Sequence, residues 1–358
     1  MGSQMYDWPE PVVSVQSLAD GGISVIPERY IKPPEDRPAT TGALSIPEQC
    51  IPVVDLAKLS AGSSECPATI LSVANACREW GLFQVVNHGV EAELMTAVMA
   101  TWREFFKLPL EEKRKLANSP TTYEGYGSLL GVEKGASLDW GDYFFLYILP
   151  SSHKNHDKWP NYPPSCREIT EEYGRQMVAL CGNVMKVLSK GLGLEVGFLQ
   201  EKFGGDEIGA CLRVNYYPKC PQPDLTLGLS AHSDPGGLTV LLADDRVPGL
   251  QVRKGASWIT VHPVTGAFVI NIGDQIQVLS NAVYKSVEHR VLASETKERM
   301  SVAFFYNPRA DLLLEPAREL VTKERPQRYD AMTFTQYRLH IRNKGPSGKT
   351  QLESLQIT

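Results

Sequence analysis

Between residues 51 and 205 the apolar positions recur mostly at helical spacing. Ile70, Val73, Ala74 and Cys77 stand at i, i+3, i+4 and i+7, which predicts an amphipathic helix ending near Gly81. Further helices are expected at 92–107, 110–116 and 165–193, with strands at 51–56 and 82–89. A glycine-rich loop around "GYGS" is expected to lead into another strand. This part of the chain is therefore predicted to be largely helical.

From about residue 207 the pattern changes to short apolar or alternating runs separated by turn residues. Such regular short runs are typical of an antiparallel sandwich or barrel. Strands are expected at 211–217, 226–232, 237–242, 249–253, 257–262, 267–272, 276–279, 284–292 and 299–306. After Pro326 a last helix is expected through "MTFTQYRLHIR". The predicted fold class is α+β with a mainly β core of two sheets.

The same pattern divides the chain into four segments. They are an extended N-terminal segment at 1–50, a helical region at 51–205, a β core at 206–326, and a C-terminal helix and tail at 327–358. The stretch "IKPPEDRPATTG" in the first segment is rich in proline and polar residues, which predicts an extended connector.

Composition narrows the class of protein. The 358 residues carry a formal net charge of −5, which argues against nucleic-acid and anionic-membrane partners, because both attract basic surfaces. The sequence holds no apolar run long enough to cross a membrane. Seven scattered cysteines without a C-x-x-C pair are typical of reduced thiols rather than of a disulfide framework. We therefore expect a cytoplasmic protein, with the nucleus as an alternative compartment.

The segment "LGLSAHSDPGGLTV" places a histidine and an aspartate two residues apart, just before a turn. Gly228, Ser230 and His232 share one face of the expected strand, and Asp234 can return to that face as the chain turns. A lone H-x-D carries little information, because both residue types are common at strand ends. Taken alone, the pair is as well explained by an ordinary strand end.

A third residue strengthens the interpretation of this pair. In "YKSVEHRVLA", His289 shares the apolar face of its strand with Val287 and Val291, so its ring needs a polar partner inside the protein. His232, Asp234 and His289 together match the set of two histidines and one carboxylate that binds non-haem Fe(II) and leaves three positions open.

Two arginines are expected on inward strand faces. Period two places Arg299 with Ser301 on one face of "RMSVAFFYNP", and Arg213 with Asn215 and Tyr217 on one face of "RVNYYPKCP". An inward arginine is costly unless it meets an anion. A buried structural ion pair is one explanation, and an anionic ligand beside the metal is the other.

These residues resemble the plant-type 2-oxoglutarate- and Fe(II)-dependent dioxygenases. The shared motifs run through most of the chain: "IPVVDL", "GLFQVVNHGV", "NYYPKCPQP", "HSD", "NIGDQIQVLSN", "YKSVEHRV" and "RMS". The resemblance implies a double-stranded β-helix (a cupin-like jelly roll), and iron bound by His232, Asp234 and His289. It also implies 2-oxoglutarate held by Arg299 and Ser301, with Tyr217 and Asn215 beside it, O2 as the oxidant, and ascorbate as a support of activity.

Within the family the chain is most similar to the jasmonate-induced oxygenases, which hydroxylate jasmonic acid. "WPEPVVSVQSLA", "TTYEGYGS", "GVEKGASLDWGDYFFL", "GACLRVNYYPKCP" and "YRLHIRNKGPSGK" carry this similarity. It implies conversion of jasmonic acid to 12-hydroxyjasmonic acid, which inactivates the hormone and lowers defence signalling. The implied substrate-binding residues are Arg213, Arg338, Arg342, Phe145 and Phe305. Arg338 and Arg342 are i, i+4 on the last helix, so they can converge on one anion, although a solvated basic helix face has the same spacing.

Two positions depart from the pattern of that group: Ala231 stands where proline usually precedes the first histidine, and Leu129 where arginine usually follows "GYGS".

Three alternative functions stay open at this point. A flavonoid-type oxygenase would take a neutral polyphenol, for which three arginines have no evident use. A zinc hydrolase could use the same ligands, but would leave Arg299 and Ser301 without a task. A cupin-like binding protein would not need an intact metal set. The oligomeric state is left open.

Overall fold

The computed structural model describes residues 11–38, 50–57, 66–128, 135–344 and 348–357, of which 340–344 only by their backbone. The strands are β1 (Val53–Asp55), β2 (Leu82–Val86), β3 (Gly125–Gly127), β4 (Asp142–Leu149), β5 (Gly209–Tyr217), β6 (Leu229–His232), β7 (Leu238–Ala243), β8 (Leu250–Lys254), β9 (Ser257–Thr260), β10 (Phe268–Ile272), β11 (His289–Val291), β12 (Arg299–Asn307), β13 (Leu313–Leu314) and β14 (Met332–Thr333). The α-helices are α1 (Val15–Asp20), α3 (Pro67–Glu79), α4 (Ala92–Phe106), α5 (Leu110–Arg114), α6 (Cys166–Gly191), α7 (Phe198–Lys202), α8 (Asp274–Leu279), α9 (Phe334–Lys344) and α10 (Thr350–Glu353). Short 3-10 helices lie at Glu28–Tyr30, Ser151–His153, His156–Lys158, Pro223–Leu225 and Arg318–Leu320.

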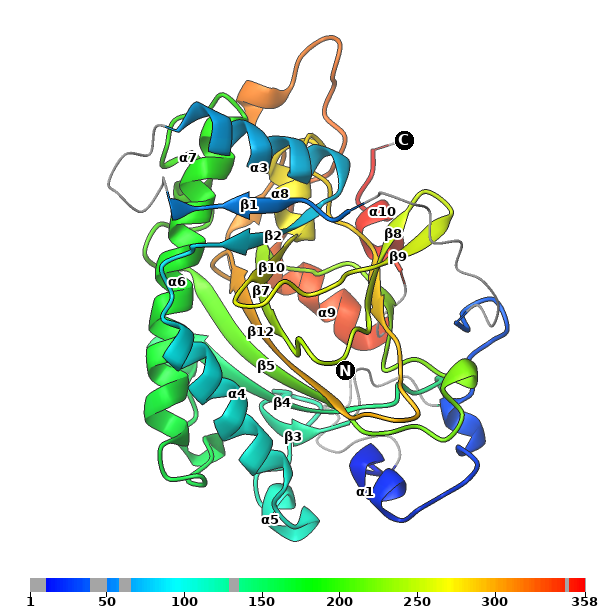
Figure 1. The fold of residues 1–358 in the computed structure, drawn as a ribbon. Helices are drawn as coiled ribbons and strands as arrows, with labels where there is room; N and C mark the ends of the chain where they lie inside the picture. The colour runs from blue at the N-terminus through cyan, green and yellow to red at the C-terminus, as the bar shows by residue number, and fades with distance from the viewer. Residues whose placement is uncertain (1–10, 39–49, 58–65, 129–134, 345–347, 358) are drawn as a thin grey trace, which may run out of the picture.

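Two sheets form the β core. The larger has the order β1-β2-β10-β7-β12-β5-β4-β3 and the smaller β6-β11-β8-β9. All of the pairings in these two sheets are antiparallel except that of β1 with β2. Figure 1 shows the long strands of the larger sheet curving beside α4 and α6, with α9 on the other side of that sheet. This is the jelly-roll fold with N-terminal helices and a C-terminal helix that the sequence predicted.

The two faces of the larger sheet have different neighbours. On one face, Val214, Val302 and Phe304 belong to the main apolar core together with Trp102 of α4 and Met177 of α6. The other face holds the cross-strand pairs Arg299–Tyr217, Ser301–Asn215, Ala303–Arg213 and Phe305–Cys211 of β12 and β5. Because side chains alternate along a strand, one face anchors the helices and the other is left to line a cavity between the sheets.

Three expectations about local structure were wrong. Residues 276–279, predicted as a strand, belong to helix α8, whose six residues are all buried. A short helix buried on every side shows no amphipathic period, so its apolar run is indistinguishable from that of a buried strand. The strand expected at 284–292 is confined to His289–Val291.

The third correction concerns the N-terminal segment, which is not extended throughout. Helix α1 begins after Ser14, whose Oγ accepts a hydrogen bond from the Ser17 backbone at 3.2 Å. Asp142 of β4 accepts from Ser14 Oγ at 2.7 Å and from the Val15 backbone at 2.8 Å. This buried carboxylate fixes the N-terminal helix to the larger sheet.

Among the described helices, none combines the length and the apolar character that crossing a membrane requires.

Candidate active site

His232, Asp234 and His289 lie together in the structure. His232 ends β6, His289 begins β11, and the two residues are cross-strand partners with ring centroids 4.4 Å apart. The Nε2 atom of each histidine lies 3.7 Å from Asp234 Oδ1. One ligand atom from each residue falls within 4.8 Å of the other two. The strand pairing and the turn after His232 thus bring together three residues that are up to 57 positions apart, since 289 − 232 = 57.

Hydrogen bonds orient all three side chains. The Nδ1 of His232 lies 2.8 Å from the Ser230 carbonyl, and that of His289 lies 3.2 Å from the Val287 carbonyl. Nδ1–H donating to a carbonyl leaves the Nε2 lone pair of each ring facing Asp234. Asn271 of β10 donates from Nδ2 to Asp234 Oδ2 at 3.1 Å, so Oδ1 stays directed at the two rings. Such outer contacts are typical of metal ligands held in place by the protein.

The protonation states suit a divalent cation. Burial, together with the neighbouring His289 ring, lowers the pKa of His232 to about 4, so this imidazole is neutral near pH 7. Burial alone would raise the pKa of Asp234, but the two imidazoles and the Asn271 hydrogen bond bring it below its ordinary value. A neutral imidazole and an ionised carboxylate are the forms that bind metals, so the donor set fits Fe(II).

Arg299 and Ser301 lie on the inner face of β12, as the alternation predicted. The Arg299 side chain is buried, with its guanidinium carbon 5.4 Å from the centre of the Tyr217 ring and its Nη1 3.5 Å from Ser301 Oγ. Its Nε has no hydrogen-bond partner among the described residues. Asn215, also buried, is the cross-strand partner of Ser301. Burial lowers the pKa of Arg299, and no ion pair joins it to a carboxylate among the described residues, so this desolvated cation can receive an anionic ligand.

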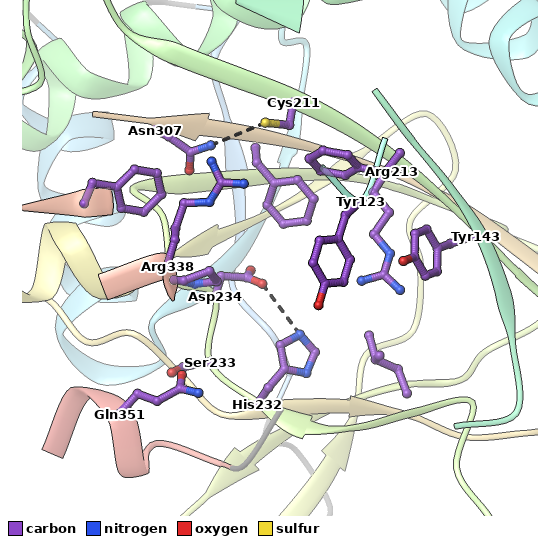
Figure 2. Close-up of a pocket in the computed structure, with 15 residues that line it drawn as sticks. Tyr123, Tyr143, Cys211, Arg213, His232, Ser233, Asp234, Asn307, Arg338 and Gln351 are labelled. Atoms are coloured by element: carbon purple, nitrogen blue, oxygen red, sulfur yellow. Dashed lines mark hydrogen bonds and ion pairs between the residues drawn. The ribbon is translucent and has the colours of Figure 1, made fainter. Parts of the chain in front are cut away.

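A pocket of about 200 Å³ opens beside His232 and Asp234. Four of the residues predicted to contact the substrate line its wall: Arg213, Phe145, Phe305 and, from α9, Arg338. The guanidinium carbon of Arg213 lies 4.2 Å from the centre of the Tyr143 ring, and its Nε has no hydrogen-bond partner among the described residues. Figure 2 shows Arg213 and Arg338 on opposite sides of the pocket, with Asp234 and His232 below them.

The structure does not place every predicted residue. Arg342 lies within α9, but its side chain is outside the described residues, and so is Leu129. Arg338 is half-buried and lines the pocket, so the solvated helix face considered as an alternative is excluded for this residue. Ala231 accepts a hydrogen bond at its carbonyl from the Gly348 backbone at 2.9 Å, so the C-terminal segment lies along β6.

The sequence-based prediction missed several residues around this pocket. Tyr143, Tyr123, Asn271 and Gln351 either line the pocket or contact the site. The period-two pattern of "DYFFLYIL" could have indicated Tyr143, because it places Tyr143 on the same face as Phe145. Tyr123 lies in a loop and Gln351 in the short helix α10, and neither segment has a periodicity that indicates where its side chains point.

Comparison with known proteins agrees with this geometry. Residues 208–308 match the 2OG-Fe(II) oxygenase superfamily, and residues 51–166 match the N-terminal region described as non-haem dioxygenase in morphine synthesis. The chain belongs to the 2OG-Fe(II) oxygenase superfamily. Member enzymes are dioxygenases that use iron and 2-oxoglutarate, and these are the cofactors of this chain. Membership supports neither the zinc hydrolase nor the non-enzymatic binding protein.

Several groups of this superfamily contain proteins similar to the chain, with higher identity to the jasmonate-induced oxygenases than to the flavonoid enzymes. The chain is 57% identical over 350 residues to jasmonate-induced oxygenase 1 of Arabidopsis thaliana, covering 97% of this chain and 87% of that protein. It is 42% identical over 323 residues to flavanone 3-dioxygenase 2 of Oryza sativa subsp. japonica, covering 90% and 92%. A crystal structure of JOX2 in complex with 2OG, Fe and JA matches with a TM-score of 0.92 and 56% identity, covering 98% of this chain and 100% of the other.

Proposed function

We propose that this dioxygenase hydroxylates jasmonic acid to 12-hydroxyjasmonic acid and thereby lowers jasmonate defence signalling. The observation that carries the proposal is the pocket beside the triad, in which two arginines flank phenylalanine walls. A small molecule with one carboxylate and an apolar body matches this lining. Identity of 57% to jasmonate-induced oxygenase 1 and the likeness to the JOX2 structure support the same substrate.

In this proposal His232, Asp234 and His289 hold Fe(II). When bound, the metal supplies the coordination positions at which 2-oxoglutarate and O2 react. The chain contributes fixed ligand geometry, because the Nδ1 hydrogen bonds and Asn271 hold the donor atoms toward one point.

Arg299 and Ser301 bind the distal carboxylate of 2-oxoglutarate, with Tyr217 and Asn215 beside them. The planar guanidinium can donate two parallel hydrogen bonds to a carboxylate. The Tyr217 ring supports the guanidinium from one side, and the Arg299 Nε can donate a hydrogen bond to the cosubstrate. These residues orient the 2-oxo acid end of the molecule toward the triad.

Arg213, Arg338 and Arg342 bind the substrate carboxylate and ketone, while Phe145 and Phe305 pack against its ring and chain. Arg213 is desolvated and forms no ion pair with a carboxylate among the described residues, so an acidic ligand lowers the energetic penalty that the free enzyme carries. Aromatic walls exclude water from the C–H bond that is to be oxidised. The protein thus orients one bond of the substrate and limits wasteful reaction.

A flavonoid-type reaction is the second candidate, since flavanone 3-dioxygenase 2 of rice shares 42% identity with the chain. The buried arginines favour an acid over a neutral polyphenol, and the jasmonate-induced oxygenases are closer in sequence. We also propose that the enzyme acts in the cytoplasm, because none of its seven cysteines, all among the described residues, forms a disulfide.

The test is product analysis by mass spectrometry. Enzyme purified without oxygen and loaded with Fe(II) is offered 2-oxoglutarate, O2 and either jasmonic acid or naringenin. The proposal expects a hydroxylated jasmonic acid and unchanged naringenin. Oxidised naringenin with unchanged jasmonic acid would replace the proposal with the flavonoid-type reaction.

A further inference from the structure

A second chamber, of about 660 Å³, adjoins the pocket, and we call it the outer chamber because residues of its lining such as Ser151 and Glu207 are exposed. The two cavities share Cys211, Asn307, Phe334 and Arg338 as a common wall. Cys211 and Asn307 come from the sheet, and Phe334 and Arg338 from α9. We call these four residues the neck. Figure 2 shows Arg338 reaching from the helix toward Asn307 across this wall.

One face of β4 runs past both cavities. Phe145 lines the inner pocket, whereas Tyr147, two residues on, lines only the outer chamber. Their rings meet edge to face with centroids 5.2 Å apart. The strand therefore continues the aromatic wall of the inner pocket through the neck to the outside.

Arg338 is held in the neck by aromatic residues. Its Nη2 donates to the Tyr147 hydroxyl at 3.3 Å, and its guanidinium carbon lies 5.9 Å from the Tyr147 ring centre and 5.6 Å from that of Phe334. In the described part of the chain no aspartate or glutamate forms an ion pair with it. A half-buried guanidinium supported by rings, with no carboxylate partner, is available to an incoming anion.

We infer that Tyr147 is a positioning residue, which holds Arg338 in the neck to receive the carboxylate of an acidic substrate. This inference rests on the proposed function, because it takes Arg338 to bind the substrate. It goes beyond that function by assigning a residue that acts through Arg338. It also explains why Tyr147, 191 residues away in sequence, contacts the helix that carries Arg338.

A double-mutant cycle tests this inference on the holoenzyme with Fe(II) and 2-oxoglutarate, without oxygen. Tyr147→Ala and Arg338→Ala are each expected to weaken jasmonic acid binding by about fivefold to tenfold, the range of one charge-assisted contact. The double variant is expected to bind as Arg338→Ala does, because Tyr147 acts through Arg338. Tyr147→Phe, which keeps the ring, is expected to lose less than Tyr147→Ala. Losses that multiply in the double variant would overturn the inference.

Two further measurements distinguish the loss of Arg338 positioning from general damage to the fold. Substrate-independent turnover of 2-oxoglutarate is expected to be unchanged in Tyr147→Ala, and its loss would indicate a general structural role. Ser151→Ala changes another residue of the outer chamber and is the matched control, with binding expected within about twofold of the wild type.

A crystal structure of Tyr147→Ala gives a readout that needs no substrate. The Arg338 guanidinium is expected to leave the neck, and a guanidinium still in place there would overturn the inference. Wild-type enzyme that fails to bind jasmonic acid would instead overturn the proposed function. In that case the crystal structure alone still decides whether Tyr147 positions Arg338.

Discussion

The metal end and the substrate end of the inner cavity are built by different means. At the metal end the side chains come from strands and from the turn after β6, and polar partners fix them. Asp234 is held by Asn271, and each histidine is held by the backbone carbonyl two residues before it. Each donor atom therefore has a defined direction before any metal binds.

At the substrate end the arginines are held by rings instead of carboxylates. Arg213 lies over Tyr143, and Arg338 lies beside Tyr147 and Phe334. These residues come from β4, β5 and α9, which are distant in sequence. Such contacts leave the guanidinium free to exchange one aromatic neighbour for an anion.

The difference indicates that the two ends of the cavity have separate functions. Side chains fixed by polar partners carry the reaction that all members of the family share, while arginines supported by rings, on β5 and α9, select the substrate. Changes at the metal end are therefore expected to stop 2-oxoglutarate turnover. Changes at the substrate end are expected to weaken substrate binding and leave that turnover intact.

Removing a metal ligand has the largest expected effect. His232→Ala should lower 2-oxoglutarate turnover by at least about 100-fold, because the remaining donors no longer close the site around the metal. Succinate formation measures this loss, and circular dichroism checks that the fold is kept. His153→Ala removes an exposed histidine and serves as the control. Turnover retained in His232→Ala would refute the iron assignment.

Arg299→Ala should raise the KM for 2-oxoglutarate by about 10-fold to 100-fold, since a hydrogen-bonded charge contributes about 1.5–3 kcal/mol. Initial rates at varied 2-oxoglutarate measure the change. Arg253→Ala, at an exposed arginine of β8, is expected to leave the KM unaltered. An unchanged KM in Arg299→Ala would mean that the cosubstrate lies elsewhere.

Arg338→Ala and Arg342→Ala should each raise the KM for jasmonic acid by about tenfold, because each removes one charge-assisted contact. The decarboxylation of 2-oxoglutarate in the absence of jasmonic acid should stay unchanged in both variants. Assays with and without jasmonic acid separate the two effects. Equal loss of both activities would show that these arginines stabilise the fold and do not bind the substrate.

The smallest effect is expected from the aromatic wall. Phe145→Leu keeps most of the apolar volume, so the KM for jasmonic acid should rise only about threefold, with the 2-oxoglutarate KM unchanged. Leu146→Met alters the opposite, core-facing side of β4 and controls for disturbance of the strand. A rise in the 2-oxoglutarate KM would contradict the separation of the two ends.

Sequence reasoning succeeded where a strand carries a strict alternation. On β12, period two placed Arg299 and Ser301 on one face and Val302 on the other, and the structure confirms both faces. His289 between two valines indicated a buried polar partner, and the structure places it beside His232. In these segments a local rule was enough, because pleating fixes the direction of every side chain.

Sequence reasoning failed where the direction of a side chain depends on tertiary packing. Helix α8 is buried on all sides, so its apolar run carries no period. Helix α1 depends on Asp142, 128 residues beyond Ser14. The Tyr147–Arg338 contact joins residues 191 apart, and no local pattern can indicate such a pair.

The most direct test of the division between the two ends is the coupling of succinate to hydroxylated product in Arg338→Ala, compared with the wild type. With saturating 2-oxoglutarate and a fixed amount of jasmonic acid, the wild type should form the two products in equal amounts. Arg338→Ala should still form succinate while the hydroxylated product falls well below it. A parallel fall of both products would show that the metal end and the substrate end are not independent.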